Sequence, residues 1–153
     1  MLEIAGEDDY GGDGYRQVLA ARIDALGLQG HVQLLGAIDA DQVRERLIQA
    51  HVFVLASWHE PLGVAYMEAM SCGVPTIGTD AGGVTELITD GVSGLLVPPK
   101  APDALAGAIL RVAADSELAQ KLGIGGRARI VEAFRSRLGA ETLRDEIAKL
   151  KTR

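Results

Sequence analysis

The sequence predicts an α/β fold built on a parallel sheet with helices on both of its faces. Two observations support this prediction. Short apolar runs alternate with amphipathic stretches as far as Pro98, which is the pattern of repeated strand–helix units. The run from Val52 to Ser57 is apolar almost throughout, which is typical of a strand buried on both faces and predicts a central place in the sheet.

The strands can be placed in order from their apolar runs and from the glycine, proline and polar residues that bound them. They are predicted at Leu2–Ala5, His31–Gly36, Val52–Ser57, Val74–Asp80 and Gly94–Pro98. Apolar residues at helical spacing predict helices between the strands and throughout the chain from Ala101 onward. Asp39 or Asp41 can cap the second helix, and Asp103 and Ser116 are expected to cap the first two helices of the C-terminal part.

Length and composition indicate one domain. The chain has 153 residues, of which 48% are hydrophobic, and this is enough to bury a core of ordinary size. No internal repeat or low-complexity linker divides the sequence. Residues 1–153 are therefore predicted to form a single domain, in which residues 126–153 are C-terminal helices.

Charge and cysteine content limit the partners and the compartment. The formal net charge of −6 argues against non-specific binding of nucleic acid, which depends on an excess of Lys and Arg. The single cysteine, Cys72, cannot form an internal disulfide. The first residues lack the basic and apolar regions of a signal peptide, and no apolar run reaches the roughly 18 residues of a membrane-spanning helix. These features predict a cytoplasmic location.

The most informative stretch is HEPLGVAYMEAMSCGVP, residues 59–75, which has one glutamate before a proline and a glycine and a second glutamate eight residues later. Pro61, Leu62 and Gly63 follow a predicted strand, and good helix formers follow from Val64 onward. Gly63 is therefore expected at a helix N-terminus, where unpaired backbone N–H groups and the helix dipole form a seat for phosphate. Ligands of parallel sheets also bind outside the carboxyl ends of the strands.

The two glutamates are expected on either side of this seat. Glu68 is five residues inside the helix, roughly 7.5 Å along its axis, where a carboxylate can accept hydrogen bonds from a pair of vicinal hydroxyls. Glu60 is on the other side and can accept from a different set of hydroxyls. The pattern suggests a ligand with a diphosphate between two sugars, which is a nucleotide sugar. A plain alternative is that Glu60 only favours the helix dipole and that Glu68 lies on a solvated face.

The wider sequence resembles a known family. Residues 57–99, SWHEPLGVAYMEAMSCGVPTIGTDAGGVTELITDGVSGLLVPP, are similar to the C-terminal signature of the retaining glycosyltransferases of family 4, which have the GT-B fold. That signature is S-x-x-E-P-x-G-x-x-x-x-E-A-M-x-x-G-x-P-V, then G-G-x-x-E-x-I and G-x-x-G-x-L-V. This chain departs from it in having Thr76 where the family often has valine. The similarity, from about Leu2 to Phe134, implies a Rossmann-like C-terminal half of a GT-B fold that lacks the first strand–helix unit.

The resemblance implies roles for the residues around the predicted helix start. Glu68 would hold the ribose hydroxyls, and Glu60, the catalytic candidate, would contact the transferred sugar near the reacting centre. The backbone amides of Leu62, Gly63 and Val64 would meet the sugar and the diphosphate. The parent reaction would be transfer of a sugar from a nucleoside diphosphate to an acceptor hydroxyl, with retention at the anomeric carbon.

Other residues are implied to line or shape the same cleft. The loop formed by Gly36, Ala37 and Ile38 would lie along the base. His59 would face donor or acceptor, although it could equally be a simple loop residue. Gly82 and Gly83 would shape the loop after the fourth strand, and turn geometry explains them equally well.

Five further positions are interpreted as structural rather than functional. Glu86 is expected to be structural rather than catalytic, and Cys72 is expected to be an inert small side chain at a helix end. Trp58 is read as packing, since a lone aromatic is weak evidence for sugar stacking. Asp8 and Asp9 are expected in a solvated turn rather than at a metal site, and no metal site is predicted.

The resemblance also implies partners and missing parts. The donor would be a UDP- or GDP-linked sugar, used as a substrate without a cofactor. Family members carry an Arg and a Lys that neutralise the diphosphate, and an N-terminal acceptor-binding domain; this chain has neither, so it is predicted to be inactive alone. The parent enzyme could associate peripherally with a membrane, and an exposed sheet edge could lead to self-association.

Two other functions stay open. One is a non-enzymatic nucleotide-binding or structural module. The other is a domain like that of the sugar-nucleotide epimerases, which need additional acid–base groups that are not evident here. The base, the sugar and the acceptor are not given by the sequence.

Overall fold

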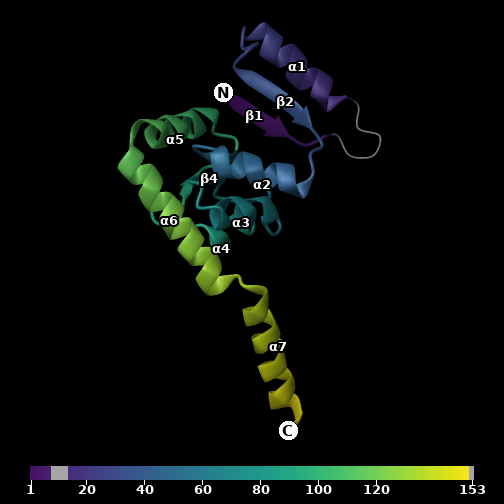
Figure 1. Cartoon of the computed structure of the whole chain (residues 1–153), viewed down its shortest axis with the longest axis vertical. Coiled ribbons are helices and arrows are strands. Elements are labelled where there is room, and N and C mark those ends of the chain that lie inside the picture. The colour runs from purple at the N-terminus through teal and green to yellow at the C-terminus, as the bar shows by residue number, and fades with distance from the viewer. Residues whose placement is uncertain (8–13, 152–153) are drawn as a thin grey trace. The chain divides into compact units, whose positions relative to one another are not determined.

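The computed structural model describes residues 1–7 and 14–151, and it divides into two compact units, residues 1–43 and residues 44–153. Figure 1 shows the helices and strands along the chain. The predicted turn at Asp8 and Asp9 lies outside the described residues. The single domain over residues 1–153 stays a prediction.

The first unit contains a pair of parallel strands and a helix. Strands β1 (Leu2–Ala5) and β2 (Val32–Gly36) pair with Leu2 opposite Val32, and helix α1 (Tyr15–Ala25) connects them. Arg16, at the start of α1, donates from Nη2 to the carbonyl oxygen of Leu34 at 2.9 Å. Both strands were predicted, and β2 begins one residue later than expected.

Helix α2 (Ala40–Gln49) begins with a reciprocal cap. The Asp39 carboxylate accepts from the Gln42 N–H at 2.9 Å, and the Gln42 side-chain oxygen accepts from the Asp39 N–H at 3.1 Å. This capping box satisfies two N–H groups at the helix start. Of the two aspartates proposed as the cap, Asp39 is therefore the one that acts.

The second unit is built on a three-stranded parallel sheet in the order β3–β4–β5, with β3 at Phe53–Leu55, β4 at Thr76–Thr79 and β5 at Leu95–Val97. Within this sheet β4 is central and buried at every position, whereas every residue of β3 is half-buried. The prediction that the Val52–Ser57 run is the central strand is wrong for this sheet. The apolar run of β3 reflects the packing of both its faces, and β4 is central although it contains two threonines and a glycine.

Among the described residues of the second unit, five helices follow α2: α3 (Val64–Ser71), α4 (Val84–Leu87), α5 (Pro102–Ala114), α6 (Ser116–Ala133) and α7 (Ser136–Lys151). The short helix α4 was not predicted. Two predicted caps are also wrong. Helix α5 begins at Pro102, so Asp103 lies inside its first turn, and α6 is capped by Asp115, whose carboxylate accepts from the Leu118 N–H at 2.9 Å.

Apolar clusters cover both faces of the three-stranded sheet. On one face Tyr66, Met70, Val84 and Leu87 from α3 and α4 pack with alternate residues of the strands, and on the other Val112 and Leu122 from α5 and α6 do the same. Helix α6 contributes Leu122 to one cluster and Ile130 to the other. The predicted arrangement of helices on both faces is therefore present in this unit.

Glycines let α6 approach neighbouring backbone. A methyl group on Gly123 would overlap the carbonyl oxygen of Gly73, and one on Gly125 would overlap that of Val92. Glycine costs roughly 0.5–1 kcal/mol relative to alanine in a helix, and here that cost is offset by close packing.

This packing gives a stability prediction. Gly125→Ala is expected to lower the free energy of unfolding by about 1–3 kcal/mol, because the new methyl group forces α6 away from Val92. Gly107→Ala in α5 is the matched control: no atom lies within 4 Å of a methyl group there, so it should raise stability by about 0.5–1 kcal/mol. Urea denaturation of both variants checks the contrast, and equal effects would contradict it.

Among the described residues, no helix combines the length and the apolar character needed to cross a membrane.

Candidate functional site

The candidate site lies where the chain leaves β3 and enters α3, at the carboxyl edge of the three-stranded sheet. Helix α3 begins after Gly63, which has a left-handed backbone with φ of 81°. A methyl group on Gly63 would lie 2.6 Å from Cδ1 of Leu87 and 3.1 Å from Cδ2 of Tyr66. Glycine is required here both by the backbone conformation and by the close packing beneath it.

The Glu60 carboxylate lies against the start of α3. Its Oε1 accepts from the Gly63 N–H at 2.9 Å and from the Leu62 N–H at 3.4 Å, and its Oε2 lies 3.5 Å from the Ser57 hydroxyl. Glu60 is therefore ordered by the same amides that were predicted to meet a ligand. That ligand contact stays a prediction.

This arrangement leaves hydrogen-bond acceptors and donors available at the helix start. A carboxylate oxygen has more than one acceptor position, and Oε2 holds only the long contact to Ser57. The N–H groups of Val64 and Ala65 lie in the first turn, where no intrahelical carbonyl can pair with them. The site thus offers an ordered acceptor beside backbone donors.

Glu68 lies one and a half turns further along α3 and is exposed. In the part of the chain that the structure describes, no side chain donates a hydrogen bond to its carboxylate. The two glutamates therefore differ: Glu60 is half-buried and ordered, whereas Glu68 faces solvent with its acceptor oxygens open.

Gly82 and Gly83, which precede α4, fix the backbone of Glu60. The Gly83 N–H donates to the Glu60 carbonyl oxygen at 2.7 Å. A methyl group on Gly82 would overlap that oxygen, and one on Gly83 would lie 2.6 Å from the carbonyl oxygen of Pro61. Gly83 has φ of −70°, which any residue adopts, so turn geometry does not explain it. Its role is close approach to the Glu60 loop.

Two buried hydroxyls lie beneath this loop, and neither was predicted from the sequence. Tyr66 is fully buried and donates from its phenol to the carbonyl oxygen of Leu55 at 2.5 Å. Thr79, at the end of β4, donates to the carbonyl oxygen of Ser57. A tyrosine among small and apolar residues between the two glutamates was the available signal for Tyr66.

Burial raises the pKa of Tyr66 from 10.0 to about 12, and the nearby Glu60 charge adds to the rise. The unfolded chain releases this proton near pH 10, whereas the folded chain keeps it until about pH 12. The free energy of unfolding is therefore unaffected below pH 10 and is expected to fall by about 2–3 kcal/mol as the pH rises to 12. Urea denaturation between pH 9 and pH 12 checks this. The free energy of unfolding of Tyr66→Phe should fall less over this pH range, because the variant has no phenol at position 66. If the free energy of unfolding depends on pH in the same way in the two proteins, Tyr66 is not the group responsible.

Trp58 and His59 are both exposed on the loop before Glu60. Trp58 is 71% exposed, and the Lys100 Nζ lies 4.6 Å from the centroid of its ring. Lys100 follows β5 and has a left-handed backbone with φ of 59°, which is uncommon for a residue other than glycine. The indole thus contacts a cation rather than the core, so its reading as simple packing is incomplete.

Gly36, Ala37 and Ile38 belong to the first unit. Gly36 ends β2 with φ of 73°, and its carbonyl oxygen accepts from the Gly6 N–H at 2.9 Å. Ala37 is exposed and Ile38 is half-buried. A hollow of about 200 Å³ in this unit contains none of these three residues. It is lined by Ile4, Ala5, Gly6, Glu7, Tyr15, Arg16, Leu19 and Leu34.

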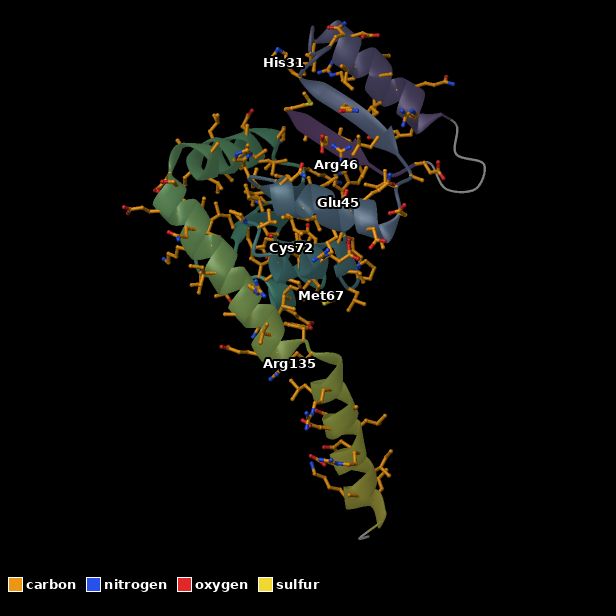
Figure 2. The ribbon with its side chains drawn as sticks, viewed as in Figure 1. His31, Glu45, Arg46, Met67, Cys72 and Arg135 are labelled. Carbon is orange, nitrogen blue, oxygen red and sulfur yellow. The ribbon has the colours of Figure 1, made fainter. Side chains whose placement is uncertain are left out.

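Two other residues singled out in the sequence have structural places. The Glu86 carbonyl oxygen, in α4, accepts from Arg129 Nη2 at 2.8 Å, and the Glu86 side chain is exposed. Cys72 is half-buried at the C-terminal cap of α3, five residues after Met67 (Figure 2). Within residues 1–7 and 14–151, no three His, Cys, Asp or Glu side chains are grouped to hold a metal ion.

Curated relatives match parts of this chain. Alpha-maltose-1-phosphate synthase of Mycolicibacterium smegmatis is 40% identical over 99 residues, which are 61% of this chain and 26% of that protein. Sucrose synthase 1 of Hordeum vulgare is 35% identical over 131 residues, which are 79% of this chain and 16% of that protein. The chain thus spans about a quarter or less of the length of these relatives.

Solved structures match more of the chain. The match to sucrose-phosphate synthase from Thermosynechococcus elongatus covers 99% of this chain and 38% of that protein's chain, with a TM-score of 0.88 and 33% identity. The match to Anabaena HepE, solved in complex with UDP-glucose, covers 94% of this chain and 40% of that protein's chain, with a TM-score of 0.85 and 28% identity. These matches confirm the predicted fold class, the α/β C-terminal half of a GT-B fold. The family model described as "Glycosyl transferases group 1" matches residues 1–129. The chain belongs to the group 1 glycosyltransferase family.

Proposed function

We propose that this chain is the donor-binding part of a retaining glycosyltransferase, which transfers a sugar from a nucleoside diphosphate to an acceptor hydroxyl. The observation that carries the proposal is the Glu60 carboxylate, which the Gly63 N–H holds at 2.9 Å at the N-terminus of α3, while Glu68 stays open on the same helix. Anabaena HepE, a structural relative, was solved with UDP-glucose bound.

In this proposal the two glutamates have separate tasks. Glu68 accepts hydrogen bonds from the two hydroxyls of the ribose, and its exposure leaves it free to do so. Glu60 accepts from hydroxyls of the transferred sugar through Oε2, while its Oε1 keeps the bond to Gly63. A carboxylate that is already ordered loses little conformational freedom when it binds.

The start of α3 would stabilise the departing diphosphate. Negative charge grows on the leaving group during transfer, and the N–H groups of Val64 and Ala65, together with the helix dipole, are fixed donors for it. These donors need no reorganisation as the charge develops. In this proposal, acceptor binding and the cationic side chains that neutralise the rest of the diphosphate charge are assigned to parts of the protein beyond this chain.

Titration calorimetry of this chain with UDP, UDP-glucose and GDP tests the proposal. We expect binding of at least one diphosphate, and tighter binding of its sugar-linked form because Glu60 then gains partners. Binding of none of the three by the native chain would contradict a donor-binding role. Equal affinity for UDP and UDP-glucose would contradict the role of Glu60.

A further inference from the structure

Two carbonyl groups set the direction in which the chain leaves β3. The last residue pair between β3 and β4 is Leu55 with Gly78. At this point the Leu55 carbonyl oxygen accepts from the Tyr66 phenol, and two residues later the Ser57 carbonyl oxygen accepts from the Thr79 hydroxyl. The path toward Glu60 is thus fixed by side chains of α3 and β4 rather than by a longer strand.

The Tyr66 ring fits between two glycines. A methyl group on Gly63 would lie 3.1 Å from Cδ2 of the ring, and one on Gly78 would lie 2.8 Å from Cε1 and 3.1 Å from the hydroxyl oxygen. Phe53 meets the ring edge-on with a centroid distance of 5.8 Å. The phenol also interacts with Thr79, so the two hydroxyls form one buried cluster. Such a cluster has little freedom to move.

The cluster is connected to the Glu60 carboxylate through Ser57 and Gly63. Ser57, whose carbonyl oxygen is held by Thr79, has its own hydroxyl 3.5 Å from Glu60 Oε2, at the long limit of a hydrogen bond. Gly63, which packs on the Tyr66 ring, donates to Glu60 Oε1. Both ends of the Glu60 loop therefore rest on Tyr66 or Thr79.

We propose that Tyr66 and Thr79 are positioning residues for Glu60: their hydroxyls hold the end of β3 so that the Glu60 carboxylate lies at the start of α3. The proposal deepens the donor-binding function and rests on it where sugar recognition is concerned. Tyr66 and Thr79 touch no substrate and act through the loop.

A first experiment needs no ligand. Amide hydrogen exchange by NMR is measured at Gly63, whose N–H is bonded to Glu60, and at Ile77 in the central strand, which reports the stability of the core. Tyr66→Phe and Thr79→Val are each expected to speed exchange at Gly63 about tenfold more than at Ile77. Glu60→Ala, which removes the acceptor, sets the upper limit.

Phe53→Leu is the matched control for stability. It removes the edge-on contact with Tyr66 and weakens the same core, but it leaves both hydroxyls and their carbonyl partners in place. It should change exchange at Gly63 and Ile77 by similar factors. If Tyr66→Phe and Thr79→Val also change both amides alike, the two hydroxyls only stabilise the fold and the proposal is overturned.

A second experiment measures sugar recognition. The ratio of UDP-glucose affinity to UDP affinity is expected to fall about three- to tenfold in Tyr66→Phe, with little change in the affinity for UDP. In a Glu60→Ala background, Tyr66→Phe should lower the ratio no further, because its effect passes through Glu60. Equal losses in the two backgrounds would overturn the proposal. If the native chain binds neither ligand, the donor-binding function fails, while the exchange experiment still decides the positioning role.

Discussion

A Glu60→Gln variant is expected to bind UDP-glucose about ten- to a hundredfold more weakly than the native chain, while its affinity for UDP stays within about twofold. Glutamine keeps a side-chain oxygen that can accept from the Gly63 N–H, so the helix start should remain intact. The amide replaces the charged acceptor Oε2, and the hydrogen bonds from the sugar hydroxyls lose their charge-assisted part. UDP has no transferred sugar and should not sense the change.

The second glutamate makes this prediction specific. Glu68→Gln should lower the affinities for UDP and for UDP-glucose by the same factor, because the ribose is common to both ligands. Glu86→Gln is the control for charge alone, since the Glu86 side chain is exposed and its hydrogen bonds, to Gly83 and Arg129, are made by its backbone. Calorimetry of the three variants with the two ligands gives six affinities. Equal losses for UDP and UDP-glucose in Glu60→Gln would remove Glu60 from sugar recognition and leave it as a helix cap.

A Gly83→Ala variant is expected to be less stable by about 1–3 kcal/mol and to bind UDP-glucose about tenfold more weakly. The new methyl group would lie 2.6 Å from the carbonyl oxygen of Pro61 and 3.4 Å from that of Glu60, so the loop has to move. The same movement strains the bond from the Gly83 N–H to the Glu60 carbonyl oxygen. Urea denaturation and calorimetry measure the two effects.

Gly91→Ala is the control that distinguishes an effect on the Glu60 loop from a general loss of stability. Gly91 has φ of 71°, so alanine there costs about 1–2 kcal/mol of backbone strain, yet no atom lies within 4 Å of the new methyl group. Gly91 precedes β5, whereas the Glu60 loop follows β3, so the two lie at opposite edges of a parallel sheet. This variant should lose stability and keep its affinity for UDP-glucose. A similar loss of affinity in both glycine variants would mean that the site responds to any destabilisation.

Local chemistry explains which parts of the fold could be predicted from the sequence. Apolar runs located all five strands, although each of the last four is shorter in the structure than its run. The centre of the sheet could not be found in this way, because Thr76 and Thr79 make β4 look less buried than β3. Their hydroxyls are satisfied by backbone carbonyl groups, and this pairing is visible only in three dimensions.

The candidate site was predictable to the extent that it depends on residues close in sequence. Glu60, Gly63 and Glu68 belong to one continuous stretch, and the structure places them around one helix start. Tyr66 lies in that stretch too, but its partner Leu55 is eleven positions away and its role depends on the packing between strand and helix. Gly83 acts through contact with Pro61, more than twenty positions earlier, which no local pattern encodes.

The indole beside Lys100 makes the loop observable in its own right. Trp58 is the only tryptophan in the sequence, it stands two positions before Glu60, and its ring is largely exposed. Intrinsic fluorescence excited near the red edge of protein absorption therefore comes from this loop alone. The chain carries its own optical probe, so collections of nucleotides and sugars can be screened for occupancy without any added label.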